Sequence, residues 1–226
     1  MISLSKRLSA VSELIPPCDI LADVGTDHGY LPVWLLQQGR VKHVFASDIK
    51  EGPLRKAKET AELYDLSACM ETILADGLQF PGAEQAEVVT ICGMGGETMI
   101  SILQNAPWTT NQRRLILQPQ SKLQELDHWL QMHHYAIEEA KLCLDSGKLY
   151  LAISVLGGGE WAHGTEETLF LHKDPMLLAY IHRELQKARH AEAGLRLASD
   201  NHQDLLLASE QRIAVLEHYE REIIKW

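Results

Sequence analysis

Residues 20–32 read ILADVGTDHGYLP and decide how the rest of the chain can fold. The first five, ILADV, are apolar except for one aspartate, which predicts a short buried strand. The strand ends at Gly25, and Gly29 precedes a helix that tolerates Pro32 in its first turn. A strand, a glycine turn and a helix in this order allow the backbone to approach a ligand closely.

The same alternation of apolar runs and helical spacing continues along the chain. Strands are predicted at residues 20–24, 44–46, 70–74, 88–92 and 115–117, and helices at 3–15, 30–38, 53–66, 97–103 and 122–132, the first capped by Ser3. This order predicts an α/β fold with a mostly parallel, doubly wound sheet. Runs at 137–144 and 148–156, joined by Asp-Ser-Gly, predict a terminal antiparallel hairpin that gives the sheet one reversed strand.

Three glycines at residues 157–159 predict a domain boundary. Beyond them, Asp-Pro at 174–175 is typical of a helix start, and only helical spacing follows. Ser-Asp-Asn at 199–201 interrupts that spacing, so we expect an antiparallel, coiled-coil-like helical hairpin. The predicted domains are residues 1–159 and 160–226.

The chain has 226 residues, 46% of them hydrophobic, which is enough for one sizeable core with an appendage. No run approaches the roughly 18 apolar residues that cross a bilayer, and the first residues lack a signal-peptide cleavage site, so we expect no membrane partner. The four cysteines lack metal-ligand spacing, which predicts free thiols, no bound metal and a cytoplasmic location. The net charge of −10 argues against a protein that coats nucleic acid, but it allows a local basic patch.

Small and acidic residues end the first four predicted strands. Ligands bind at the carboxyl ends of the strands in a doubly wound sheet, so these residues are candidates for a binding site. Asp48 follows the first glycine turn by roughly 20 residues, the interval at which a carboxylate meets ribose hydroxyls. Asp76 is placed to reach an adenine edge, although either carboxylate could serve only as a helix cap. The strand-end residues are Asp23, Gly25, Asp48, Asp76, Gly77, Gly93 and Met94.

The glycine turn reads GTDHG and lacks the G-x-G-x-x-G of dinucleotide-binding enzymes. A pyrophosphate needs exposed backbone N–H groups at a helix N-terminus. Asp23 and Asp27 would repel phosphate but suit a cationic ligand. The sequence therefore predicts an adenosine cofactor that carries a sulfonium and no phosphate, S-adenosylmethionine, with S-adenosylhomocysteine as its product.

Several motifs extend this prediction: ADVGTDHGYLP in the opening stretch, SDI at 47–49, ADGL at 75–78, ICGMGGETM at 91–99, LSKRL at 4–8 and LQPQS at 117–121. With these motifs the chain resembles the bacterial tRNA (adenine-22-N1)-methyltransferases over essentially its whole length. The resemblance implies a Rossmann-like class I methyltransferase domain that binds S-adenosylmethionine, and a coiled-coil-like C-terminal domain. It also implies methylation of N1 of an adenine in tRNA.

The strand ends and the resemblance together define a predicted site. Its cofactor-binding residues are Asp23, Gly25, His28, Gly29, Tyr30, Asp48, Ile49, Asp76, Gly77, Gly93 and Met94. Methylation of N1 leaves a cationic ring, so a nearby carboxylate could stabilise that charge or take the N6 proton. Asp27 and Glu97 lie just past strand ends and are the predicted catalytic residues, although Asp27 could be a turn residue and Glu97 a helix-start acid. Tyr30 could also stack on the base or be buried under its helix.

Basic residues are the predicted contacts to tRNA: Lys6, Arg7, Arg113, Arg114, Arg183 and Lys187. Arg183 and Lys187 are spaced i, i+4 on one helical face. The alternative is that this face is only solvated. The oligomeric state is not defined by the sequence, and a monomer is compatible with it.

Two other functions stay open at this level. A methyltransferase for a small molecule or a protein would not need RNA or residues 160–226. A non-catalytic cofactor sensor or RNA-binding protein would carry a broken cofactor site, whereas the motifs here are intact.

Overall fold

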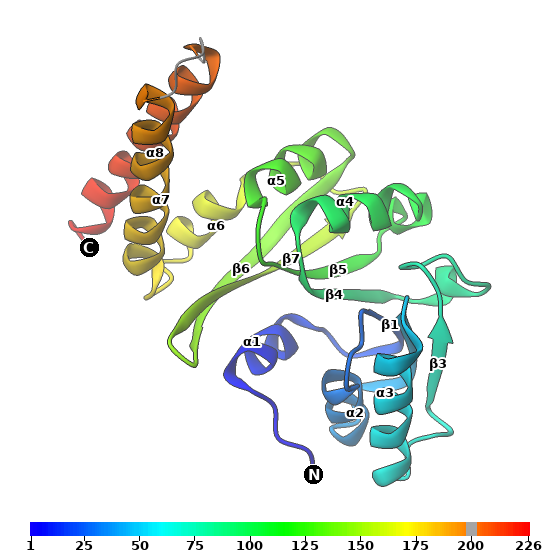
Figure 1. Ribbon diagram of the computed structural model, residues 1–226. Coiled ribbons are helices and arrows are strands. Elements are labelled where there is room, and N and C mark those ends of the chain that lie inside the picture. Colours follow the sequence, from blue (N-terminus) through cyan, green and yellow to red (C-terminus); the bar gives the residue numbers. More distant parts are fainter. Residues whose placement is uncertain (198–202) are drawn as a thin grey trace. The chain divides into compact units, whose positions relative to one another are not determined.

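The computed structural model describes residues 1–197 and 203–226 (Figure 1). The chain divides into two compact units, Met1–Thr168 and Leu169–Trp226, which we call the sheet unit and the helical unit.

The sheet unit is built on a seven-stranded sheet in the order β3-β2-β1-β4-β5-β7-β6. Its strands are β1 (Cys18–Val24), β2 (Val41–Asp48), β3 (Met70–Leu74), β4 (Val88–Met94), β5 (Arg114–Pro119), β6 (Tyr135–Asp145) and β7 (Lys148–Gly157). Neighbours from β3 to β5 pair in parallel, and β7 pairs antiparallel with both β5 and β6. The predicted α/β fold with one reversed strand is therefore confirmed.

Helices cover both faces of this sheet. They are α1 (Lys6–Leu14), α2 (Tyr30–Gln37), α3 (Glu51–Leu63), α4 (Gly96–Gln104) and α5 (Leu123–Met132), with short 3-10 helices η1 (Ala83–Gln85) and η2 (Pro107–Thr110). Figure 1 shows α1, α2 and α3 on one face and α4 and α5 on the other. The cap of α1 is Ser5, whose hydroxyl accepts a hydrogen bond from the Leu8 amide, so the predicted Ser3 cap is wrong by two residues.

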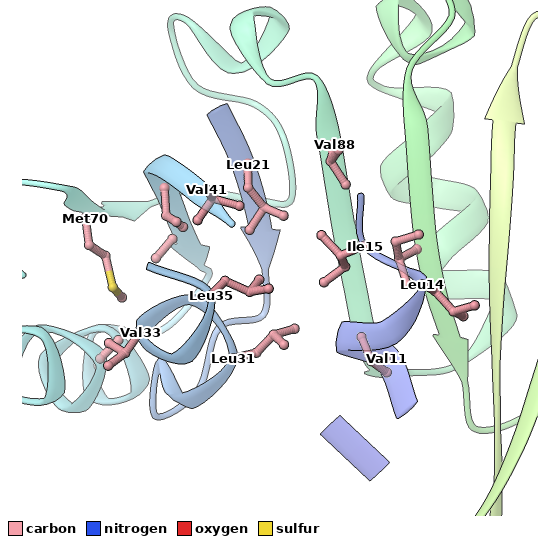
Figure 2. Packing of buried hydrophobic residues seen from close by; sticks show 14 of the residues in the cluster. Val11, Leu14, Ile15, Leu21, Leu31, Val33, Leu35, Val41, Met70 and Val88 are labelled. Atoms are coloured by element: carbon pink, nitrogen blue, oxygen red, sulfur yellow. The ribbon is translucent and has the colours of Figure 1, made fainter. Parts of the chain in front are cut away.

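A buried apolar cluster fixes α1 and α2 against the sheet. Val11 of α1 and Ile15, just after it, are fully buried in one cluster with Leu21 of β1 and Leu31 of α2, and Leu31 points toward Val11 (Figure 2). Burial of one such side chain contributes about 1.5–3 kcal/mol, so α1 is held firmly. The segment Ser3–Leu8, which leads into α1 and forms its first residues, is thereby brought to the carboxyl ends of the central strands.

The glycine run at 157–159 is not the point where the two units divide. A Cβ on Gly157 would lie 1.9 Å from the Thr109 carbonyl oxygen, so this glycine allows close packing against η2. The next segment forms a helix that the sequence analysis missed, α6 (Thr165–Leu171). Its first turn is tied back to α5, because Asp127 accepts hydrogen bonds from the Thr165 amide and hydroxyl at 2.9 and 2.7 Å. The division consequently falls inside α6.

The helical unit contains an antiparallel pair, α7 (Leu177–Leu197) and α8 (Gln203–Ile223). Two ion pairs show the orientation: Arg189 pairs with Glu217, and Arg196, further along α7, pairs with Glu210, earlier in α8. The predicted polar turn at 199–201 lies outside the described residues. Helix α7 begins at Leu177, after a turn in which Asp174 accepts from the Met176 amide at 2.8 Å. No helix of the described ranges has the length and apolar character to span a membrane.

Candidate active site

A cavity of about 620 Å³ opens at the carboxyl ends of β1, β2 and β4. Five segments supply its wall: the residues before and within α1, the end of β1 with the turn after it, the end of β2, the end of β4, and the residue that follows β5. The lining residues are Ser3, Ser5, Arg7, Leu8, Asp23, Gly25, Thr26, Asp27, His28, Tyr30, Leu31, Asp48, Cys92, Gly93, Met94 and Gln120. The cavity thus lies at the edge of the sheet where the sequence analysis expected a ligand.

The turn after β1 is shaped by left-handed backbone at three positions. Gly25, Asp27 and Gly29 have φ values of +72°, +50° and +68°, and the Gly25 amide donates to the Ser47 carbonyl at 2.8 Å. A Cβ on Gly25 would lie 2.3 Å from Met94 Cε, so this glycine leaves room for the loop after β4. Asp27 adopts left-handed backbone more readily than most residues do, which accounts for an aspartate in this turn.

Asp23 places a buried carboxyl in the cavity wall. The residue is only 4% exposed, and its Oδ1 accepts a hydrogen bond from the Thr90 hydroxyl at 2.5 Å. Burial raises the pKa of this carboxyl, and the Thr90 and Thr26 hydroxyls offset part of the rise. The Thr26 hydroxyl is itself buried and makes no well-formed hydrogen bond within the described part of the chain.

Cys92 also lines the cavity. Burial raises the pKa of its thiol, and the nearby Asp23 carboxyl raises it further, so the thiol is protonated at neutral pH. All four cysteines are free, as predicted.

Asp48 ends β2 at the cavity, beside the loop after β3. Its Oδ1 accepts from the Lys50 amide at 2.9 Å. The Ser47 hydroxyl donates to the Gly77 carbonyl at 2.9 Å, and the Ala75 amide donates to the Asp48 carbonyl at 3.1 Å. These bonds bring the Asp76–Gly77 loop next to Asp48, although neither loop residue lines the cavity.

His28 and Tyr30 form a stacked pair in the wall. Their ring centroids are 5.1 Å apart with an interplanar angle of 21°. Tyr30 is 43% exposed, which excludes burial under its own helix. Asp27 projects beside them, with its side chain 69% exposed and its Oδ1 3.8 Å from His28 Nε2. The cavity therefore offers two adjacent rings and an accessible carboxylate.

Arg7, which the sequence predicts to contact RNA, lies in the wall of the cavity. Its Nη1 donates to Gln118 Oε1 at 2.9 Å, and its backbone amide donates to Asp145 Oδ2 at 3.1 Å. The guanidinium also stands 5.8 Å from the centre of the Tyr150 ring. The N-terminal wall was missed because only the LSKRL motif signals it in the sequence.

The structure brings most of the predicted site together. Eight of the residues predicted to bind the cofactor or to act in catalysis line the cavity: Asp23, Gly25, Asp27, His28, Tyr30, Asp48, Gly93 and Met94. Five others lie outside its wall: Gly29, Ile49, Asp76, Gly77 and Glu97. A Cβ on Gly29 would lie 3.1 Å from Ala57 of α3, so this glycine serves helix packing. Glu97, in the first turn of α4, is 73% exposed and faces Lys122, with 3.8 Å between Oε1 and Nζ.

Most of the basic residues predicted to bind tRNA are engaged within the chain. Arg113 donates to the Glu84 carbonyl at 3.0 Å, and Arg114 pairs with Glu138. Arg183 and Lys187 share the Glu184 carboxylate, each at 2.9 Å. Lys6 is exposed, and no acidic partner for it is found in the ranges described. In those same ranges no cluster of three or more His, Cys, Asp or Glu could hold a metal ion.

Comparison with known proteins agrees with this architecture. A family model for a methyltransferase domain matches residues 4–153, and the chain belongs to this family. A tRNA (adenine(22)-N(1))-methyltransferase from Bacillus subtilis (strain 168) is 34% identical over 150 residues, which are 66% of this chain and 63% of that protein. The chain thus matches somewhat less than two thirds of that relative's length.

Two solved structures are similar over nearly the whole chain. The B. subtilis m1A22 tRNA methyltransferase TrmK has a TM-score of 0.85 at 27% identity, covering 97% of this chain and 100% of that one. M. capricolum TrmK, in complex with the cofactor product S-adenosylhomocysteine, has a TM-score of 0.81 at 26% identity, covering 97% and 99%. The resemblance drawn from the sequence motifs is confirmed.

Proposed function

We propose that the chain binds S-adenosylmethionine in this cavity and methylates N1 of adenine 22 in tRNA. The observation that carries the proposal is the chemistry of the cavity wall: three aspartates, 23, 27 and 48, beside a turn that lacks the glycine pattern of a phosphate site. Such a wall suits a cationic nucleoside. The relative of known structure that holds S-adenosylhomocysteine supports the same cofactor.

The residues present fit such a cofactor. Asp48 is placed to accept hydrogen bonds from ribose hydroxyls. Its Oδ1 accepts from the Lys50 amide, which leaves Oδ2 for the ribose. The adjoining Asp76–Gly77 loop is placed to meet the adenine edge. Asp23 and the Thr26 hydroxyl provide acceptors for a cationic amine, and Gly25 and Gly93 keep side chains out of the cavity. When bound, S-adenosylmethionine supplies an electrophilic methyl group on its sulfonium.

N1 of adenine lies on the Watson–Crick edge, so the target base must be unpaired and turned into the cavity. The exposed Tyr30 ring, stacked on His28, gives such a base a flat surface to lie on. Catalysis then consists largely of holding N1 in line with the methyl carbon. The chain's part is to orient the base and to exclude water.

Asp27 is the better placed of the two candidate carboxylates. It lines the cavity next to the stacked rings and is accessible, so it can stabilise the positive charge that develops on the ring or accept the N6 proton. Glu97 faces Lys122 outside the wall. We therefore assign the catalytic role to Asp27 and expect Glu97 to contribute much less to kcat.

The remaining assignments follow from a tRNA substrate. Such an enzyme acts in the cytoplasm, and the exposed Lys6, which has no acidic partner in the ranges described, is accessible to folded RNA. Recognition of RNA shape suits a chain whose net charge is −10. We propose no membrane partner and no metal requirement.

The test is transfer of a radiolabelled methyl group to unmodified tRNA, followed by nucleoside analysis. The proposal expects label in 1-methyladenosine at position 22. An active preparation that forms no 1-methyladenosine, or that labels a protein or small molecule without RNA, would overturn it.

A further inference from the structure

Some basic side chains of the chain form ion pairs with carboxylates, and others do not. In the helical unit, Arg189 and Arg196 pair with glutamates of α8, and Lys187 pairs within α7. In the sheet unit, Lys42 pairs with Asp19 at 2.7 Å. Charges neutralised in this way are poorly available to a polyanion, because a phosphate must first displace the carboxylate.

Three lysines beside the cavity differ from these. Lys6 is exposed between Ser5 and Arg7, which both line the cavity. Lys50 is exposed two residues after Asp48. Within the described residues, neither has an acidic partner at ion-pair distance.

Lys56 is the third of these lysines and stands on α3. Its Nζ lies 3.5 Å from Nε2 of His28, a member of the stacked pair in the cavity wall. The imidazole is the only side chain at hydrogen-bond distance from this ammonium in the described ranges. No carboxylate there neutralises the charge of Lys56. We call Lys6, Lys50 and Lys56 the rim lysines.

The rim lysines come from one side of the sheet. Figure 1 shows α1 and α3 flanking α2 on the same face. Lys6 begins α1, Lys50 precedes α3, and Lys56 lies within it. They are therefore carried by elements of the sheet unit that border the cavity, and none belongs to the helical unit.

We propose that the rim lysines bind the phosphates that flank the target base, and that this rim, not the paired arginines of the helical unit, is the principal electrostatic contact to RNA near the site. The inference rests on the proposed function. The acidic wall repels an RNA backbone, so a base can enter only if the phosphates on either side are held by cations at the mouth. Unpaired lysines at that mouth supply them.

The experiment compares two triple variants of the full chain in binding to unmodified tRNA. The rim variant carries Lys6→Ala, Lys50→Ala and Lys56→Ala. The control variant carries Lys42→Ala, Arg55→Ala and Lys58→Ala, which remove the same charge from residues that pair with Asp19, Glu59 and Glu62. Two of the control positions lie on α3, like Lys56, so a general effect on that helix would appear in both variants.

The rim variant is expected to bind tRNA at least about ten-fold more weakly and to flatten the slope of log affinity against log salt by about 2, at roughly 0.7 per lost phosphate contact. The control should retain both, and both variants should bind S-adenosylmethionine like the parent chain in calorimetry. Replacing the three rim lysines by arginine should restore tRNA binding. Equal tRNA affinities and salt slopes in rim and control variants would overturn the proposal.

The proposed function fails on a different result. If the unmodified chain forms no 1-methyladenosine, the reaction assigned to it is wrong whatever the variants bind. If it does form 1-methyladenosine and the rim variant methylates with unchanged KM for tRNA, only the assignment of the rim fails.

Discussion

The backbone amide of Arg7 donates to Asp145 Oδ2 at 3.1 Å and joins residues 138 positions apart. Asp145 stands at the tip of the β6–β7 hairpin, so the hairpin caps the first turn of α1. At the other end of the helix, Glu13 pairs with Lys141 of β6. Helix α1, which carries one side of the cavity wall, is therefore held by a distant strand pair at both ends.

Removing this cap should weaken cofactor binding without unfolding the chain. In Asp145→Ala the Arg7 amide loses its acceptor, and Ser5 and Arg7 are no longer fixed at the cavity. We expect a several-fold loss of S-adenosylmethionine affinity, measured by calorimetry, with unchanged far-UV circular dichroism.

Lys148→Ala is the matched control, because it alters the residue paired with Asp145 across the hairpin and leaves the capping carboxylate in place. It should bind the cofactor like the parent chain. The same interactions hold the pKa of Asp145 below its usual value, led by the bond from the Arg7 amide. The stabilisation is therefore complete above the ordinary pKa of an aspartate and is lost as the pH falls through the lowered value. A cofactor affinity in Asp145→Ala equal to that of Lys148→Ala would show that the cap is irrelevant.

The aspartates of the wall should separate binding from turnover. Asp48→Ala removes the carboxylate placed for the ribose, so cofactor binding should be lost. Asp27→Ala should bind the cofactor normally but lower kcat by about 10²–10⁴-fold, the usual contribution of a positioned acid or base. Glu97→Ala should lower kcat much less, because Glu97 lies outside the wall.

Equilibrium dialysis with labelled cofactor and single-turnover methylation measure the two effects. Equal loss of cofactor binding in all three variants would remove the catalytic assignment. A larger kcat effect at Glu97 than at Asp27 would reverse it.

The order of strands and the residues at their ends could be predicted because both are local features. A buried strand is read from its own apolar run, and the turn after β1 from its own glycines. The carboxyl ends of parallel strands then meet at one edge by geometry alone. Asp23, Asp48 and Met94 were therefore placed at one site without any knowledge of their neighbours.

What the sequence did not reveal depends on partners far along the chain. Arg7 faces the cavity because Asp145 caps α1. Helix α6 begins at Thr165 because Asp127, 38 residues earlier, accepts hydrogen bonds from the Thr165 hydroxyl and amide. The arginines of α7 looked free in the sequence, since their partners on α8, such as Glu217, are 28 residues away. Periodicity carries no information about such pairs.

The last glycine of the GMGG motif should serve packing. A Cβ on Gly96 would lie 2.3 Å from the Lys122 carbonyl oxygen, and the Gly96 amide donates to the Ser121 carbonyl at 2.9 Å. Gly96→Ala must push two backbone segments apart, so we expect a loss of about 1–3 kcal/mol in the free energy of unfolding, measured by urea denaturation. Gly52→Ala is the control, because nothing lies within 4 Å of its Cβ position. It should be stabilising by about 0.4–1 kcal/mol, and a Gly96→Ala chain as stable as the Gly52→Ala chain would refute the packing role.

Asp23 should show a conflict between stability and function. Burial raises the pKa of its carboxyl above the ordinary 3.8, so the folded chain binds this proton more tightly than the unfolded chain. The corresponding stabilisation is complete below the ordinary pKa and is lost as the pH rises through the raised value. Asp23→Asn keeps an oxygen that can accept from Thr90 but has no proton to lose, so its stability advantage over the parent chain should grow with pH across that window. Each kcal/mol should appear as about 2–4 °C in Tm for a chain of this size.

The same substitution should weaken cofactor binding, because an amide offers a cationic ligand no negative charge. Bound cofactor would favour the ionised carboxyl in the parent chain, so the rise in Tm on adding S-adenosylmethionine should increase with pH in the parent and stay flat in Asp23→Asn. Thermal melts across the window, with and without cofactor, test both expectations together. Parallel curves of Tm against pH for the two proteins would show that burial does not raise the pKa of the Asp23 carboxyl. A rise in Tm on adding S-adenosylmethionine that is as large in Asp23→Asn as in the parent chain would show that the charge of Asp23 does not hold the ligand.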